Sequence, residues 1–81
     1  MTKQDIKNKV FDILSELSGI DNFSETDKLQ EDLGLDSLGL VTLLLSIEDA
    51  FEIILEADDM NPFELISVND VIILAEKYNG L

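Results

Sequence analysis

Apolar residues near the start of the chain recur at the spacing of one helix face. Thr2 stands before them with Asp5 three positions later, an arrangement typical of an N-terminal cap. Gly19 follows the last apolar position, where a helix readily ends. The pattern predicts a helix over about residues 3 to 18, with this apolar stripe: Ile6, Val10, Ile13, Leu14 and Leu17.

Between residues 20 and 36 this periodicity is lost. Polar residues alternate irregularly with a few apolar ones, namely Ile20, Phe23, Leu29, Leu33 and Leu35. A connection of this length is unusual in a compact domain and tends to have a function. The scattered apolar side chains predict that the connection packs across the domain.

A second, strongly apolar helix is predicted to begin at Asp36-Ser37, just after Gly34. We expect one face to consist of Leu38, Val41, Leu44, Leu45 and Phe51, widened by Leu40, Leu43 and Ile47. A helix with so many apolar positions is expected to lie centrally, with contacts on more than one side.

Two further helix starts follow. Asn61-Pro62-Phe63-Glu64 predicts a short third helix, because Asn caps helices and Pro suits the first helical position. Ser67-Val68-Asn69-Asp70 predicts a fourth, with a stripe at Val71, Leu74, Ala75 and Tyr78 and an end at Asn79-Gly80. The β-branched run at residues 71–73 would also suit a strand, but its cap and spacing favour a helix. Residues 53–55 are expected to be irregular.

The predicted fold is all-α: a small bundle of three main helices plus a short helix, with a long loop between helices one and two. No repeat or linker divides the 81 residues, so we expect a single domain over residues 1–81. A domain of this size buries only about 60% of its unfolded surface. That leaves little room for a deep active-site cleft, and we do not expect an enzyme.

The charge balance narrows the choice of partners. Eighteen acidic residues face five basic ones, for a net charge of −13. Such a field repels nucleic acids and anionic lipid surfaces and attracts basic patches on other proteins. Simple solubility is the alternative explanation of the acidity. We expect a monomer that binds neither nucleic acid nor membrane.

The sequence lacks cysteine and histidine, which removes disulfides, thiol nucleophiles, catalytic triads and the common transition-metal ligands. The glycines do not fit a calcium loop or a phosphate-binding loop, so no metal site is expected. The N-terminus is polar, unlike a signal peptide, and the apolar runs are far shorter than a membrane span. We therefore expect a soluble, cytoplasmic protein.

One candidate functional site remains in the sequence, the stretch Leu33-Gly34-Leu35-Asp36-Ser37-Leu38. A serine at the start of a helix, after a long loop, is exposed and close to the positive end of the helix dipole. Helix N-termini stabilise anions, so Ser37 is well placed to hold a phosphodiester. The alternative is structural, because Asp and Ser are both ordinary N-cap residues.

The stretch resembles the attachment motif of acyl carrier proteins, a Gly-any-Asp-Ser-Leu sequence that enters the second helix. The resemblance continues through Val41, Leu44, Leu45, Ile47-Glu48-Asp49 and Phe51, where that family has a hydrophobic helix and an acidic pair before an aromatic residue. The helix order and the long first loop also agree. The resemblance therefore covers essentially the whole chain.

The resemblance implies a role for each matching residue. Ser37 would receive 4′-phosphopantetheine from coenzyme A through a magnesium-dependent phosphopantetheinyl transferase. The terminal thiol of this arm would carry acyl groups as thioesters. Asp36 would help the transferase to recognise the site. Leu38 and Val41 would form an apolar patch for acyl-loading and synthase enzymes, with Glu48 and Asp49 contacting basic residues on them. The alternatives are core packing for the apolar pair and a solvated surface for the acidic pair.

Two departures bear on the pathway. The fatty-acid members of the family usually carry acids where this chain has Gly39 and Thr42. We therefore expect different partner enzymes, in a dedicated pathway for a polyketide, a nonribosomal peptide, a modified lipid or cell-wall aminoacylation. Aminoacyl, peptidyl and D-alanyl carriers stay open as alternatives, although Asp36 favours the acyl or alanine-carrying types.

Two readings from other classes also stay open: an acidic helical adaptor with unmodified Ser37, and a small enzyme that uses carboxylates. For a carrier, the interior could open to shelter an acyl chain. The residues that we expect to line this interior are Leu44, Leu45, Phe51, Val71 and Ile72.

Overall fold

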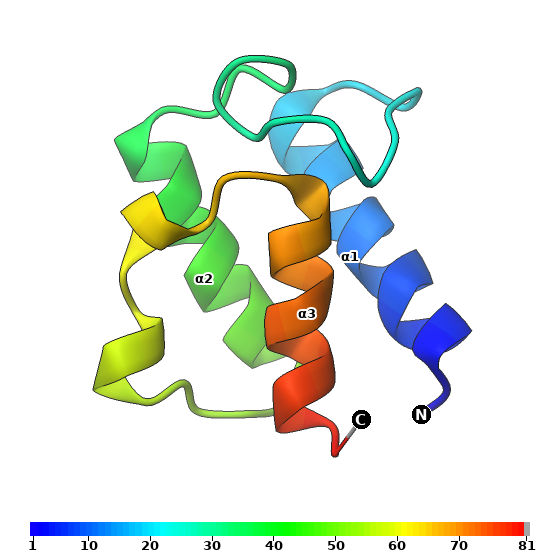
Figure 1. Ribbon diagram of the computed structural model, residues 1–81, viewed down its shortest axis with the longest axis vertical. Helices are drawn as coiled ribbons and strands as arrows, with labels where there is room; N and C mark the ends of the chain where they lie inside the picture. The colour runs from blue at the N-terminus through cyan, green and yellow to red at the C-terminus, as the bar shows by residue number, and fades with distance from the viewer. Residues whose placement is uncertain (81) are drawn as a thin grey trace.

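The computed structural model describes residues 1–80, and these form three α-helices and two short 3-10 turns. Along the chain they are α1 (Lys3–Ser18), α2 (Ser37–Phe51), η1 (Ala57–Asp59), η2 (Pro62–Glu64) and α3 (Val68–Tyr78) (Figure 1). No strand occurs in this part of the chain apart from one isolated bridge between Lys28 and Ser67. The all-α prediction is confirmed, and α1 has the predicted bounds.

The helix ends follow from the local sequence. Thr2 and Ser67 form capping boxes with Asp5 and Asp70, in which each side chain accepts a backbone N–H of the other residue. After α1 the chain turns through Gly19 at φ 74°, a left-handed conformation that glycine adopts without a steric penalty. These caps explain why the boundaries of α1 and α3 could be predicted closely.

The segment between α2 and α3 contains the predicted short helix, as a single 3-10 turn, and one further turn. The expected short helix at Asn61 is the 3-10 turn η2, in which the Asn61 side chain accepts the N–H of Phe63 at 3.1 Å. Helical geometry ends at Leu65, whose backbone is extended and whose side chain enters the core. The turn η1 was not predicted. Residues 53–55 are irregular, as expected.

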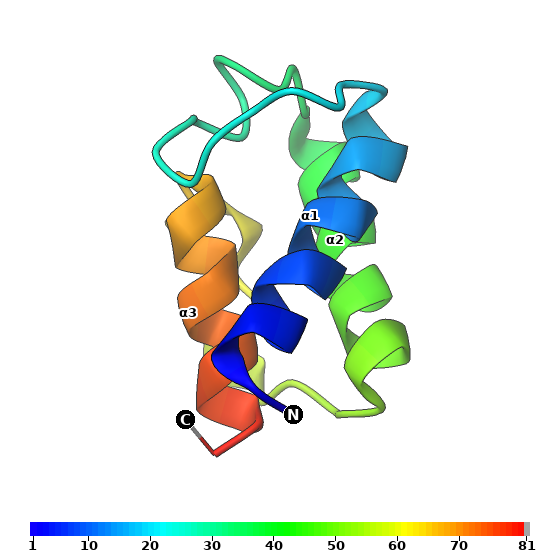
Figure 2. The same cartoon turned by 90° about the vertical axis from the view of Figure 1, so that its right-hand side faces the viewer.

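The three helices enclose one apolar core, and α1 lies against both α2 and α3 (Figures 1 and 2). Each helix contributes one buried stripe. The stripes comprise Ile6, Val10 and Leu14 of α1, Leu40, Leu43, Leu44, Ile47 and Phe51 of α2, and Val68, Val71, Ile72, Leu74 and Ala75 of α3. Every buried side chain in the described residues is apolar.

The buried face of α2 is not the face that we expected. Leu38, Val41 and Leu45 are 72%, 40% and 54% exposed, whereas Leu44 and Phe51 are buried as predicted. At about 100° per residue, the three exposed side chains share the side opposite the core stripe. The expectation that Leu45 lines the interior is therefore wrong. Both sides of α2 are apolar enough to fit the pattern, and only the packing shows which is buried.

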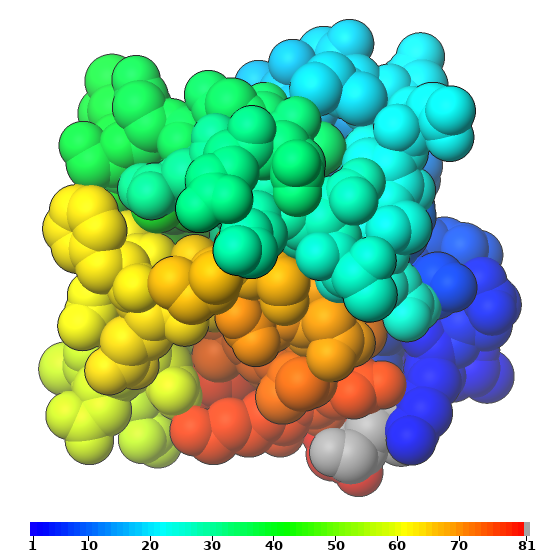
Figure 3. All heavy atoms as spheres, turned by 45° about the horizontal axis from the view of Figure 1, so that its top comes forward, coloured from blue at the N-terminus to red at the C-terminus, as the bar shows by residue number. Residues whose placement is uncertain are grey.

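The long loop crosses the molecule and is fixed at several points. Its Leu29 N–H donates to the Ile66 carbonyl at 2.9 Å, and the Val68 N–H donates to the Asp27 carbonyl at 2.9 Å. On the other side, the rings of Phe23 and Phe11 stack with centroids 4.8 Å apart. Figure 3 shows the loop, in cyan to teal, lying over the end of the bundle. The predicted packing of this connection across the domain is confirmed.

A hydrogen-bonded cluster joins η1 to the end of α3. The Tyr78 hydroxyl donates to Asp59 Oδ2 at 2.5 Å and accepts the Glu56 N–H at 2.9 Å. Lys77 Nζ lies 2.9 Å from the same Asp59 oxygen. The hydrogen bond from Tyr78, with that from Lys77, holds the pKa of Asp59 below its usual value. The cluster ties the segment after α2 to the C-terminal helix.

We expect Tyr78→Phe to weaken this tie and to change the acid stability of the protein. Because the folded-state pKa of Asp59 is lowered, its contribution is present above the unfolded-state pKa and is lost as the pH falls through the folded-state value. The variant should melt at a lower temperature at pH 7, and its melting temperature should fall less steeply below pH 4. Thermal unfolding followed by circular dichroism between pH 7 and pH 3 measures both. Coincident curves for wild type and variant would contradict the assignment.

Candidate functional site

The start of α2 is held in place by the residues just before it. Leu33 and Leu35 are buried, and the Leu35 N–H donates to the Leu29 carbonyl at 3.0 Å. Gly34, between them, has φ 73°, a left-handed conformation that lets both leucines turn into the core. The end of the long loop is thus anchored, and it delivers the next two residues to one fixed position on the surface.

Asp36 is the N-cap of α2. Its side chain accepts the Gly39 N–H at 2.8 Å, and its carbonyl accepts the Leu40 N–H at 2.9 Å. Gly39 suits this close cap, because a Cβ there would lie 3.3 Å from Asp36 Oδ1. Gly39, which stands where fatty-acid carriers usually have an acid, thus leaves room for the Asp36 side chain at the cap.

Ser37 is the first residue of α2, not its cap. The side chain is exposed, and within residues 1–80 its hydroxyl takes part in no hydrogen bond. The structural alternative raised by the sequence, that Asp-Ser serves only as a cap, therefore applies to Asp36 alone. The Ser37 hydroxyl is therefore accessible from solvent.

The helix dipole acts at Ser37 together with a nearby negative charge, the carboxylate of Asp36. The dipole of the 15-residue helix α2 favours an anion here, but the Asp36 carboxylate already occupies one N–H of the first turn. No lysine or arginine occurs between Lys28 and Lys77. A phosphodiester on Ser37 would have room because the side chain is exposed, and the remaining N–H groups of the first turn could hydrogen-bond to it. No basic residue near Ser37 in the sequence would pair with its charge.

Leu38 and Val41 lie on the solvent side of α2, so the alternative of core packing is wrong for both. Leu45 continues the same side, and we call these three residues the α2 stripe. An exposed apolar row that begins beside Ser37 is suited to contact with a partner protein. The sequence pattern alone predicts Leu45 in the interior, whereas it is exposed. The signal that could have found it is its four-residue spacing from Val41.

The acidic pair has two different surroundings. Glu48 is half-buried, and its Oε2 accepts the Leu55 N–H at 2.8 Å, which fixes the turn after α2. Asp49 is exposed near the end of the helix. Glu48 therefore has a structural role that the sequence did not indicate, while Asp49 is free to meet a partner.

The capping role of Asp36 leads to a stability prediction. Asp36→Ala should lower the free energy of unfolding by about 1 kcal/mol, because one N–H of the first turn loses its partner. Asp36→Asn keeps an oxygen at the cap and should change the stability by much less. Urea denaturation of both variants measures the difference. Equal stability of the Ala and Asn variants would show that the hydrogen bond to Gly39 contributes nothing.

No group of three or more His, Cys, Asp or Glu residues between residues 1 and 80 is arranged to hold a metal ion. Within the same range no helix has the length and apolar character needed to cross a membrane.

Comparison with known proteins gives consistent matches. Residues 8–74 match the family model described as "Phosphopantetheine attachment site". The chain is 36% identical over 81 residues to the acyl carrier protein of Thermotoga maritima, which covers 98% of each chain. It is 37% identical over 82 residues to that of Akkermansia muciniphila, covering 99% of this chain and all of the relative. With that of Desulforapulum autotrophicum the identity is 41% over 70 residues, covering 83% of this chain and 88% of the relative.

Proposed function

Because this chain belongs to the acyl carrier protein family, we propose that it holds acyl intermediates as thioesters on a 4′-phosphopantetheine arm attached to Ser37. Covalently attached 4′-phosphopantetheine is the cofactor of the family, and its members are carriers rather than enzymes. The observation that supports Ser37 as the attachment point is its free, exposed hydroxyl at the anchored start of α2.

The attachment step uses the Ser37 hydroxyl as the nucleophile. Oγ attacks the pyrophosphate of coenzyme A, a bond forms between Oγ and phosphorus, and 3′,5′-adenosine bisphosphate leaves. The hydroxyl proton passes to the transferase. The arm supplies a thiol, which this cysteine-free chain lacks. Asp36, beside Ser37, is proposed to contribute to recognition by the transferase while it caps the helix.

Carriers of this family act with a phosphopantetheinyl transferase and with synthase enzymes. We propose that Leu38 and Val41 make the apolar contact with these enzymes and that Asp49, with the outer part of Glu48, meets basic residues on them. Exposure of the apolar pair and the absence of any basic residue between Lys28 and Lys77 support this. Docking of this kind should weaken as salt rises.

We also propose that residues 1–81 act as one monomeric carrier domain in the cytoplasm, where coenzyme A is available. The pathway is a fatty-acid, polyketide or related biosynthesis. Gly39 and Thr42 leave the surface near Ser37 less acidic than in fatty-acid carriers, which favours a dedicated set of partner enzymes. An aminoacyl or D-alanyl cargo is the alternative within the same chemistry.

Thiol chemistry tests the carrier function, because the unmodified chain contains no thiol. After treatment with coenzyme A, magnesium and a broad-specificity transferase, thiol titration of the denatured protein should find one thiol per chain. With octanoyl coenzyme A as donor, the protein should instead carry an octanoyl thioester that neutral hydroxylamine removes. A thiol count that stays at zero, while the transferase modifies a known carrier, would contradict the proposal and favour an acidic adaptor.

A further inference from the structure

A groove runs between α1 and α2, away from Ser37. It has a volume of about 280 Å³ and is lined by Ile13, Glu16, Leu17, Ser46, Asp49 and Ala50. We propose that this α1–α2 groove receives an arginine side chain of the enzymes on which the carrier docks. The proposal rests on the carrier function above, since a carrier must bind partner enzymes, and it extends their contact surface onto α1.

The floor of the groove is apolar. Ile13 and Leu17 of α1 and Ala50 of α2 are partly buried and pack against the core. The methylene groups of a long side chain can cover such a surface while its charged head stays at the rim. The groove thus fits a side chain that is apolar along its length and polar at its tip.

The rim carries two carboxylates from different helices. Glu16 comes from α1 and Asp49 from α2, and both are exposed. No ion pair within residues 1–80 involves either of them. A cation that enters the groove therefore meets two acidic groups that form no ion pair with a lysine of the described chain.

The two helices that form the groove are linked beside it by Lys9. Lys9, one turn before Ile13 on α1, donates from Nζ to the Ala50 carbonyl at 2.8 Å. Its ammonium lies 5.3 Å from the centre of the Phe51 ring. This contact joins α1 to the end of α2. It also engages Lys9, the lysine nearest in sequence to the groove residues of α1. A preformed site loses less conformational entropy when a ligand binds.

The groove also continues the α2 stripe. Asp49 follows Leu45 by four residues, so the two share one side of α2. A partner that contacts the α2 stripe can therefore also reach the groove, which begins one helical turn further along α2. Arginine suits this position better than lysine, because its planar, weakly hydrated head can serve two carboxylates at once.

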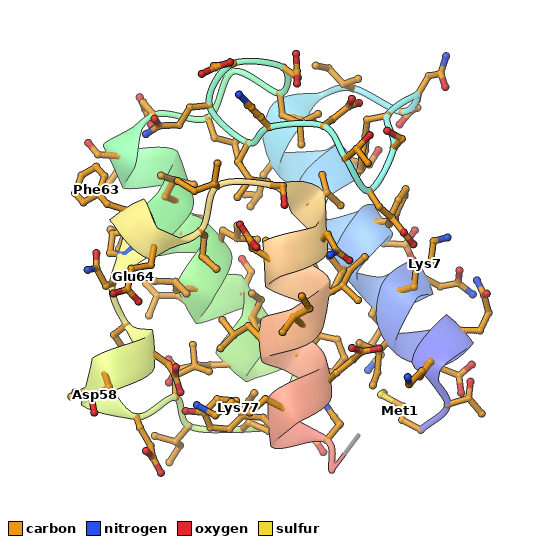
Figure 4. All side chains as sticks on the ribbon, in the orientation of Figure 1. Met1, Lys7, Asp58, Phe63, Glu64 and Lys77 are labelled. Carbon is orange, nitrogen blue, oxygen red and sulfur yellow. The ribbon has the colours of Figure 1, made fainter. Side chains whose placement is uncertain are left out.

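The test is a titration of the unmodified, ¹⁵N-labelled protein at low salt with the peptide acetyl-Leu-Arg-Leu-amide. Its matched controls are the peptides with citrulline, which keeps the shape without the charge, and with lysine. The groove is altered by Glu16→Gln with Asp49→Asn. A control pair, Asp58→Asn with Glu64→Gln, removes the same charge from the outward-pointing side chains of η1 and η2 (Figure 4).

We expect saturable shifts of the Ile13, Leu17, Ser46 and Ala50 amides with the arginine peptide and none with citrulline. The groove variant should bind about tenfold more weakly, and the control pair less than twofold. The proposal would be overturned if the citrulline peptide caused the same shifts as the arginine peptide, or if the lysine peptide bound with the same affinity. Equal weakening of binding in the groove variant and the control variant would also overturn it. Shifts that change when the free protein is diluted would do so too, because a second copy would then occupy the groove. The titration does not involve Ser37, so its result is independent of the attachment experiment.

Discussion

Replacing Ser37 by alanine is expected to abolish attachment of phosphopantetheine and to leave the fold unchanged. The alanine removes the only atom of the site that can form the bond to phosphorus. The Ser37 hydroxyl is exposed and has no hydrogen bond within residues 1–80, and Asp36 keeps its place as the cap. Release of 3′,5′-adenosine bisphosphate should fall to the background rate. The far-ultraviolet circular dichroism and the melting temperature should match those of the wild type.

Ser24→Ala is the matched control, because Ser24 is an exposed serine of the long loop, outside α2 and outside the α1–α2 groove. This variant should be modified at the wild-type rate. Modification of Ser37→Ala, or loss of modification in Ser24→Ala, would contradict the assignment of Ser37. A changed circular dichroism spectrum in Ser37→Ala would show instead that the serine supports the fold.

Ile47→Ala is expected to lower the free energy of unfolding by about 2 to 5 kcal/mol. Ile47 of α2 is completely buried, so the change removes apolar burial and leaves a cavity. A domain of this length has a total stability on the order of 4 to 12 kcal/mol. The variant should therefore lose a large fraction of its stability, and urea denaturation at fixed salt measures the loss.

Leu45→Ala, two residues away, provides the control. Leu45 is 54% exposed, so its truncation should change the stability by only about 0.5 kcal/mol. The pair of variants tests directly which side of α2 faces the core. A larger loss from Leu45→Ala than from Ile47→Ala would reverse the assignment of the two sides.

The elements with side-chain caps could be predicted from sequence, and the others could not. Thr2 and Ser67 form capping boxes from residues three positions apart, so the bounds of α1 and α3 depend on local chemistry alone. The turn η1 has no such cap, and its acids follow no helical pattern. Its place depends on Tyr78, a contact across 19 residues that no local pattern contains.

The orientation of α2 shows a second limit of the sequence. Its apolar residues fill both sides of the helix, so the periodicity fits two stripes about equally well. Packing against α1 and η2 buries the side of α2 with Leu40 and Ile47 and leaves the side with Leu38 and Leu45 in solvent. An apolar residue on the exposed side of a helix follows the same sequence pattern as one on the buried side.

For the site, the motif gave the position of Ser37 but not its local role. Asp and Ser both cap helices, and only the backbone geometry at residue 36 separates the capping residue from the free one. The bond between Glu48 and Leu55 was likewise hidden, because it depends on how the chain turns after α2. Such contacts are set by tertiary structure.

The most direct test of the central claim is the intact mass of the wild-type protein after incubation with coenzyme A, magnesium and a broad-specificity phosphopantetheinyl transferase. Fragmentation then places any added mass among the serines. The account predicts one added phosphopantetheinyl group per chain, on Ser37. An unchanged mass, with the transferase active on a known carrier, or a group on another serine would contradict it.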